Sequence, residues 1–156
     1  AVPATAAGGQ APVPVVVRVG ANASTAQVVR VVAAGLAAGS APVVSTPVAL
    51  PGPIATALAA ADVEVHHEDR DAWASRIRSL AAQEGPHAGA RVRVVGDADE
   101  VAAVYAAAGG KPDIAVYGGP VVSAGRVEML PHLHEQAVSI TAHRFGTPND
   151  LSHGLI

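Results

Sequence analysis

The chain contains no cysteine, and only 3% of its 156 residues are aromatic. The lack of cysteine excludes disulfide bonds and fits a reducing compartment, so we expect the protein to be cytoplasmic. Because aromatic side chains are so few, the hydrophobic core has to be built from Val, Ala, Leu and Ile. The same scarcity makes the chain a poor candidate for nucleic-acid binding, which commonly relies on aromatic rings stacked on bases.

Charged residues are also scarce, at 15% of the chain, and the formal net charge is only −3. A charge this small creates no strong field for capturing nucleic acid or anionic lipid. No run approaches 18 consecutive strongly apolar residues, so we expect no membrane span. With so few charges, much of the surface has to be Ala, Gly, Ser and Thr. We therefore expect a partner to cover part of it, either a neighbouring domain or a second copy in a homo-oligomer.

The length fits one domain with additional segments at its ends. Residues 1–11 are rich in Ala, Gly and Pro without any periodicity, and we interpret them as a linker within a longer polypeptide. Residues 12–120 carry the regular pattern of a globular domain. We interpret residues 121–156, where that pattern ends, as a flap followed by a docking or lid motif.

Within residues 12–120, short strand patterns alternate with helical patterns. The β-branched or alternating runs predict strands at 13–19, about 42–45, 62–66, 91–95 and 114–117. Helices are predicted between them by apolar residues at helical spacing and by caps, at Ser24 with Gln27, at Pro51 to Pro53, at Asp69 or Asp71, and at Asp97 with Glu100. Val28, Val31, Val32, Leu36, Trp73, Ile77, Leu80, Val101, Val104 and Tyr105 are expected on the buried faces. This alternation predicts an α/β fold, a Rossmann-like parallel sheet with helices on both faces.

Beyond Pro120 the pattern changes. We expect a small hairpin or flap over residues 121–130, turning around Ser123 to Gly125, and an extended segment over 136–141. The fold prediction therefore includes a C-terminal flap and an extended tail.

One loop has the position of a ligand site. Gly20 to Ser24 follows the first strand and precedes a helix, and a helix N-terminus attracts anions. However, Asn22 and Ser24 stand where a dinucleotide-binding GxGxxG loop would have glycines. An ordinary capped turn explains the loop, and an independent nucleotide- or anion-binding module is the alternative function.

The histidines suggest no defined metal centre. His66 and His67 are adjacent, so in a strand they point to opposite faces. His132, His134 and His143 could converge with Glu135, but their spacing matches no zinc motif. We expect solvated or interface histidines and no metal site, with a metal-dependent module as a further alternative.

Other reactive side chains give equally little support for catalysis. Ser123 and Ser139 lack the glycines of a nucleophile elbow. The arginines at positions 76, 78, 91 and 93 are interpreted as solvated charges on helices and strand edges. We expect no catalytic and no cofactor-binding residue in this chain.

The end of the chain carries a resemblance. The run HEQAVSITAHRFGTPNDLSHGLI, preceded by DIAVYGGPVVSAGRVEMLPHL, resembles the C-terminus of the proline utilization A family. These bifunctional enzymes join proline dehydrogenase to L-glutamate-γ-semialdehyde dehydrogenase, and some members add a C-terminal domain of the aldehyde dehydrogenase superfamily. AVSITAHRFG is the most specific part of the likeness. His134 departs from the arginine that the family often has before Glu-Gln, so no ion pair is carried over there.

The resemblance implies a role without catalysis. In that family the additional domain packs on the catalytic aldehyde dehydrogenase domain, and its terminal motif helps to close the cavity that links the two active sites. The matching residues, which would form this lid, are Ser139, Ile140, Thr141, His143, Arg144, Phe145, Gly146, Thr147 and Pro148. FAD and NAD would be bound by other domains of the parent enzyme. Aldehyde oxidation in this superfamily needs a cysteine thiolate, which this chain lacks. A fold cap that never touches the cavity is the purely structural alternative.

Overall fold

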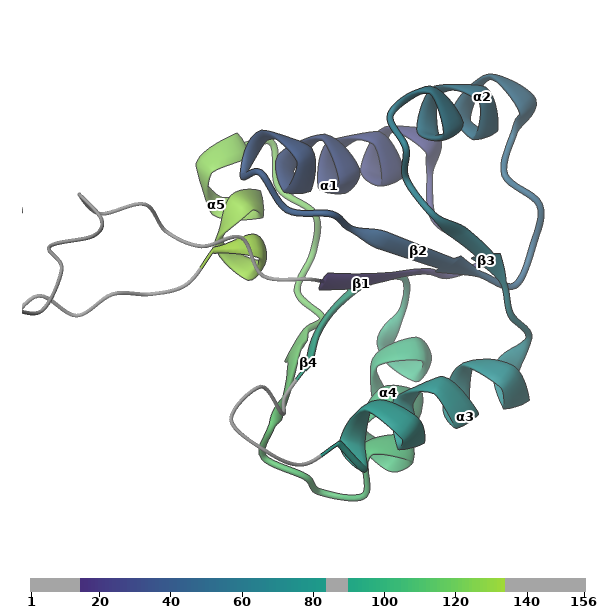
Figure 1. The fold of residues 1–156 in the computed structure, drawn as a ribbon, viewed down its shortest axis with the longest axis vertical. Helices are drawn as coiled ribbons and strands as arrows, with labels where there is room; N and C mark the ends of the chain where they lie inside the picture. The colour runs from purple at the N-terminus through teal and green to yellow at the C-terminus, as the bar shows by residue number, and fades with distance from the viewer. Residues whose placement is uncertain (1–14, 84–89, 134–156) are drawn as a thin grey trace, which may run out of the picture.

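The computed structural model describes residues 15–83 and 90–133 (Figure 1). Its centre is a five-stranded sheet in the order β3-β2-β1-β4-β5, and every pair in it is parallel. The strands are β1 (Val15–Val19), β2 (Val43–Thr46), β3 (Val65–His67), β4 (Ala90–Val95) and β5 (Ile114–Tyr117). The strand order reverses between β1 and β4, which is the Rossmann-type arrangement. The predicted α/β, Rossmann-like fold is thus confirmed.

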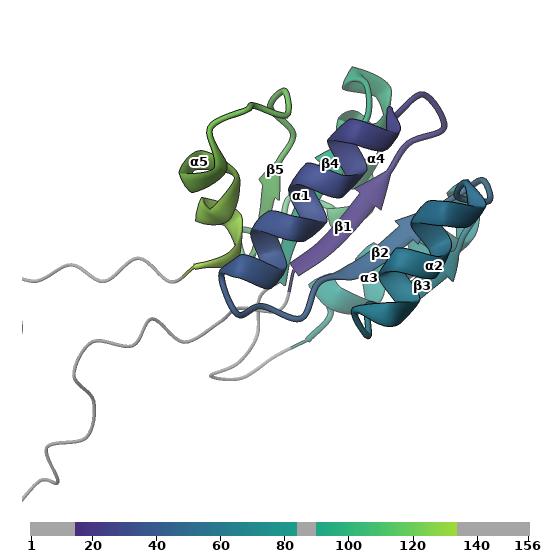
Figure 2. The same cartoon turned by 90° about the horizontal axis from the view of Figure 1, so that it is seen from above.

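Helices cover both faces of the sheet, as Figures 1 and 2 show from two directions. On one side lie α1 (Thr25–Ala37), α2 (Gly52–Ala60) and α5 (Gly125–Met129). On the other side lie α3 (Arg70–Ala81) and α4 (Ala98–Ala108). This division follows from right-handed crossovers on either side of a strand-order reversal. None of the helices in the described ranges has the length and hydrophobicity that crossing a bilayer requires.

The side-chain period of two along the central strands gives each face its own core. On the α1 face, Val15, Val17 and Val19 of β1 pack in one cluster with Val28, Val31 and Val32 of α1. On the opposite face, Val92 and Val94 of β4 pack in a second cluster with Trp73, Ile77 and Val104. Valine supplies most of the first cluster, whereas the second combines three valines with Trp73, Ile77, Ala108 and Ile114.

The helix starts are fixed by local capping. Ser24 caps α1 in a reciprocal box with Gln27, as predicted. Asp69 caps α3 by accepting from the N–H groups of Asp71 and Ala72. Asp97 caps α4, but the predicted box with Glu100 is wrong, because the Glu100 carboxylate pairs with Arg18 of β1.

The segment after Pro120 differs from the prediction. In place of a hairpin or flap, it forms the five-residue helix α5 and a 3₁₀ turn at Leu130–His132. Gly125 opens α5 and is not the tip of a turn. A helix this short is not stable alone, so tertiary contacts must hold it in place. The predicted extended segment at 136–141 lies outside the described residues.

Smaller errors lie at element ends and on exposed faces. β3 begins at Val65, because Asp62 takes a left-handed conformation with φ of 55° after α2. Leu36 and Tyr105, both predicted to be buried, are exposed. β1 is described only from Val15, so its predicted start at residue 13 is untested.

Candidate functional site

Of the several hollows in the described surface, two are lined by buried arginines. The first lies where the strand order reverses, at the carboxyl ends of β1 and β4, and has a volume of about 210 Å³. We call it the switch-point cleft. It is lined by Arg18, Gly20, Ala21, Asn22, Pro47, Arg70, Trp73, Gly96, Asp97, Asp99, Glu100 and Ala103. The predicted Gly20 to Ser24 loop therefore lies beside the place where Rossmann-type folds bind nucleotides.

The loops that follow β1 and β4 lie close to each other at the cleft. The Gly20 N–H donates to the Val95 carbonyl at 2.8 Å, which extends the contact between β1 and β4 beyond the end of β1. A Cβ on Gly20 would lie 3.3 Å from the Cα of Gly96, so the two loops approach closely. The crevice that usually opens between diverging strand ends is thereby narrowed.

The Arg18 side chain occupies the floor of the cleft and is only 2% exposed. Its Nη1 donates to Ser45 Oγ and to the Glu68 carbonyl, both at 3.0 Å. Its Nε donates to a Glu100 carboxylate oxygen at 3.2 Å, and its guanidinium lies 5.0 Å from the centre of the Trp73 ring. These contacts neutralise the positive charge and hold the guanidinium in place.

The remaining charges of the cleft do not favour phosphate. Asp97, Asp99 and Glu100 line it, against Arg70 and the already paired Arg18. At the α1 N-terminus, the Gln27 N–H donates to Ser24 Oγ, and the Gln27 amide oxygen accepts from the Ser24 N–H. Part of the donor set that would hold an anion is therefore already used. The cleft is a polar crevice with more acidic than basic groups.

Glu68 links this region to α3. Its Oε1 accepts from Arg76 Nε at 2.7 Å. Desolvation raises the pKa of Glu68, but hydrogen bonds from Ser45 and Arg76 and the nearby positive charges outweigh it, so the pKa is lowered. Arg76 is half-buried in this pair, whereas Arg78 is exposed as predicted and donates to Ser75 Oγ.

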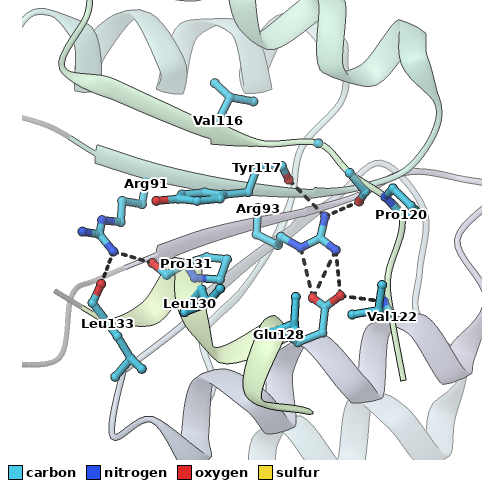
Figure 3. A pocket seen from close by; sticks show the side chains of 13 residues that line it. Arg91, Arg93, Val116, Tyr117, Pro120, Val122, Glu128, Leu130, Pro131 and Leu133 are labelled. Carbon is cyan, nitrogen blue, oxygen red and sulfur yellow. Dashed lines mark hydrogen bonds and ion pairs between the residues drawn. The ribbon is translucent and has the colours of Figure 1, made fainter. Parts of the chain in front are cut away.

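The second hollow lies beside β5 and has a volume of about 570 Å³ (Figure 3). We call it the β5 groove. It is lined by Arg91, Arg93, Val116, Tyr117, Gly118, Gly119, Pro120, Val122, Val127, Glu128, Leu130, Pro131 and Leu133. These residues come from β4, β5, the loop after β5, and the α5 segment. In the described ranges β5 pairs only with β4, so the groove follows an edge of the sheet.

A buried ion pair forms the inner wall of the groove. Arg93 is 3% exposed, and its Nε and Nη2 donate to the Glu128 carboxylate at 3.1–3.3 Å. Its Nη1 donates to the carbonyls of Val94, Tyr117 and Gly119. Glu128 Oε1 also accepts from the Val122 N–H at 2.7 Å. These bonds tie β4, the loop after β5 and α5 together (Figure 3), which explains why a five-residue helix is held here.

Arg91 lies one pleat before Arg93 on the same face of β4. Its Nη1 donates to the carbonyl of Pro131 at 3.0 Å and to the carbonyl of Leu133. The prediction that Arg91 and Arg93 are solvated charges is wrong. The sequence contained a usable signal, since an arginine inside a β-branched run of a central strand is buried on one face and needs partners. The same signal applies to Arg18, which the prediction did not consider.

His132 is fully buried between these elements and the C-terminal half of α1. Neither ring nitrogen has a hydrogen-bond partner among the described residues. Burial and the nearby charge of Arg93 lower the pKa of His132 to about 4, so its ring is neutral at neutral pH. A Cβ on Gly35 would lie 2.7 Å from His132 Cε1, so the absence of a side chain at position 35 makes room for the ring. The expectation of a solvated or interface histidine is wrong at this position.

Most of the remaining predicted candidates are not brought together. His66 Nε2 lies 2.8 Å from a Glu64 carboxylate oxygen. In residues 15–83 and 90–133, no three His, Asp or Glu side chains are placed to share a metal ion. His134, Glu135 and His143 lie outside the described residues. So do all the predicted lid residues, from Ser139 to Pro148.

No family model, curated protein or solved structure matches this chain.

Proposed function

We propose that this chain is a non-catalytic accessory domain of a cytoplasmic, bifunctional proline-catabolic oxidoreductase. Such an enzyme converts proline to glutamate through pyrroline-5-carboxylate and glutamate semialdehyde. In this proposal the chain packs on the aldehyde dehydrogenase domain and helps to seal the cavity through which the intermediate passes. The motif from Ser139 to Pro148 supplies the covering segment. FAD and NAD belong to the catalytic domains of the parent enzyme.

The observation that carries the proposal is the small, narrowed cleft at the switch point. An α/β chain with this topology would bind a dinucleotide at the carboxyl ends of β1 and β4. Here the Arg18 guanidinium, paired with Glu100 and lying over Trp73, forms the floor and leaves a cleft of about 210 Å³, which is below the range of about 300–1,000 Å³ typical of ligand sites. Together with the lack of a cysteine nucleophile, this supports an accessory role over a dehydrogenase role.

Several large apolar side chains are exposed, on both faces of the sheet. Val29, Val48, Tyr105, Val127 and Leu130 are all large apolar residues with at least 46% of their surface exposed. Burying such side chains against a partner is favourable, at about 25 cal/mol for each Å² removed from water. The identity of the partner rests on the resemblance of the terminal motif.

The first experiment measures nucleotide binding. NAD⁺ is titrated into the purified chain by isothermal calorimetry, and NADH formation is followed with glutamate semialdehyde as substrate. We expect neither heat of binding nor turnover, because the cleft above Arg18 is small and lined by more acidic than basic groups, and no thiolate is present. Saturable NAD⁺ binding would support the alternative, an independent nucleotide- or anion-binding module at Gly20 to Ser24.

The second experiment tests the seal in the parent enzyme. Deleting residues 139–156 should slow the coupled conversion of proline to glutamate more than either half-reaction, because the intermediate escapes from an open cavity. A deletion of residues 1–11, the predicted linker, is the matched control and should leave coupling unchanged. Coupling is measured as the lag before NADH forms when proline is the substrate, because an escaping intermediate delays the second reaction. If both deletions leave this lag unaltered, the sealing role is wrong.

A further inference from the structure

The arginines with buried or half-buried side chains differ in one respect. Arg18, Arg76 and Arg93 lie 3.2, 2.7 and 3.1 Å from a glutamate oxygen, respectively. Arg91 has no described carboxylate within ion-pair distance and is held by two backbone carbonyls. A half-buried guanidinium without a counter-ion can offer its free N–H donors to an anion. We propose that the β5 groove binds a small monocarboxylate with an apolar body, whose carboxylate pairs with Arg91.

The geometry of Arg91 suits this anion. Its Nη1 is held by the carbonyls of Pro131 and Leu133, which fixes the plane of the guanidinium (Figure 3). Both hydrogen bonds of Arg91 use Nη1, so the edge formed by Nε and Nη2 has no acceptor among the described residues. Two parallel N–H donors in a fixed fork match the two oxygens of a carboxylate.

The walls of the groove determine the rest of the ligand. Val127 and Leu130 are 51% and 54% exposed although they line a concave surface. The Tyr117 ring extends along the groove on the side of Arg91 (Figure 3). A volume of about 570 Å³ lies within the range of small-molecule sites, about 300–1,000 Å³. An apolar body packed on these side chains would remove them from water.

A monoanion fits better than a phosphate. The charges of Arg93 and Glu128 cancel each other, so Arg91 supplies the only unpaired charge among the described lining residues. A second negative charge on the ligand would therefore find no further unpaired cation among the described lining residues. Because α5 has only five residues, its N-terminus offers no anion site of its own.

The test uses the full chain and a matched pair of probes, hexanoate and its neutral analogue hexanamide. Binding is followed by calorimetry and by amide chemical shifts. We expect hexanoate to shift resonances of residues 116–122 and 127–133, and to bind about tenfold or more tightly than hexanamide. Equal affinity of the two probes, shifts confined to the Gly20 to Ser24 loop, or no hexanoate binding up to about 10 mM would overturn the proposal.

Three substitutions and one control substitution refine this test. Arg91→Gln should weaken hexanoate binding about tenfold or more, whereas Arg78→Gln on the opposite face of the sheet should have no effect. Since Arg91→Gln also removes bonds to two carbonyls, Val127→Glu provides a second variant. It alters an exposed position and places a competing carboxylate in the groove, so binding should again fall about tenfold or more. Retained affinity in either variant overturns the proposal.

The third substitution, Glu135→Gln, asks whether the chain supplies its own counter-ion just beyond Leu133. A tenfold gain in hexanoate affinity in this variant would mean that Glu135 occupies the site, and the proposal would be wrong. The proposal does not depend on the accessory role, because all these measurements use the isolated chain without a catalytic domain.

Discussion

The switch-point cleft and the β5 groove each contain a buried arginine, but the two arginines act differently. Arg18 forms the floor of its cleft and leaves only about 210 Å³ open above it. Arg93 lies in the wall of its groove, where Glu128 and three carbonyls satisfy it and leave the neighbouring space open. The partner of Arg18 is the 24%-exposed side chain of Glu100, whereas that of Arg93 is the 5%-exposed Glu128. The comparison shows that a buried arginine can either narrow a ligand site or support its wall. Arg18 pairs with a partly exposed carboxylate at the cleft, whereas Arg93 pairs with a buried carboxylate behind the groove surface.

The largest expected effect tests the difference between the two ion pairs. Glu128→Ala should lower the free energy of unfolding by about 3–5 kcal/mol, because it leaves Arg93 buried without a counter-ion. Urea unfolding monitored by circular dichroism would measure this. The double variant Arg93→Met, Glu128→Leu should recover most of the loss. If Glu128→Ala lowers the free energy of unfolding no more than Glu100→Ala does, the two ion pairs do not differ in their contribution to stability.

The next effect concerns pH on the groove side. His132 binds a proton below pH 4 or so in the folded state, but near its ordinary pKa of about 6.5 in the unfolded state. Between these values the unfolded state binds more protons, so the free energy of unfolding falls as the pH is lowered through this window. The loss should reach about 3 kcal/mol near pH 4.

Stability measured at several pH values would check this expectation. His132→Leu should flatten the profile between pH 4 and 6.5 relative to the unsubstituted chain. If the difference in free energy of unfolding between the two proteins stayed constant from pH 4 to 6.5, the role of His132 would be contradicted. Glu68, whose lowered pKa stabilises the folded state until it is protonated, adds a loss at lower pH from the cleft side.

A third pair of substitutions compares how tightly the two regions pack. Gly35→Ala would place its Cβ 2.7 Å from the buried His132 ring and should cost about 1–3 kcal/mol. Gly96→Ala in the cleft would place its Cβ 3.2 Å from Glu100 Cγ and 3.3 Å from Glu100 Cβ, which is a milder approach than the 2.7 Å contact at Gly35. We expect a loss below about 1 kcal/mol there. Thermal unfolding of both variants would measure these losses of stability. Equal losses would show that the two regions do not differ in packing.

The smallest effect is expected for Glu100→Gln. The carboxylate is partly exposed, and Arg18 keeps its bonds to Ser45 and the Glu68 carbonyl, so the loss should be about 1 kcal/mol or less. Chemical unfolding measures it, and NAD⁺ titration of the same variant shows whether the cleft opens. A loss comparable to that of Glu128→Ala would make the two ion pairs equivalent.

The fold was largely predictable because its signals are local. The β-branched run of β1 and the caps at Ser24, Asp69 and Asp97 each lie within a few residues of the structure they specify. Alternating strands and helices then leave few topologies other than a parallel sheet covered on both faces. The order of the strands was not predicted, because no short-range pattern encodes which edge the chain returns to.

The groove was not predicted because its determinants lie far apart in the chain. Arg93 and Glu128 are separated by 35 positions, and Arg91 reaches carbonyls 40 and 42 positions away. α5 is too short to show helical periodicity, and its glycine start resembles a turn. Only the presence of arginines inside β-branched strands indicated that charged groups would have to find partners in the core.

The chain has a single tryptophan, Trp73, which is 1% exposed under the Arg18 guanidinium. Its indole emission is therefore an intrinsic optical probe of the sheet face opposite α1. Global unfolding should move this emission to longer wavelength as the indole enters water. A molecule entering the hollow next to β5, on the far side of the sheet, should leave the spectrum unchanged. One fluorescence trace can thus separate loss of structure from occupancy without any label.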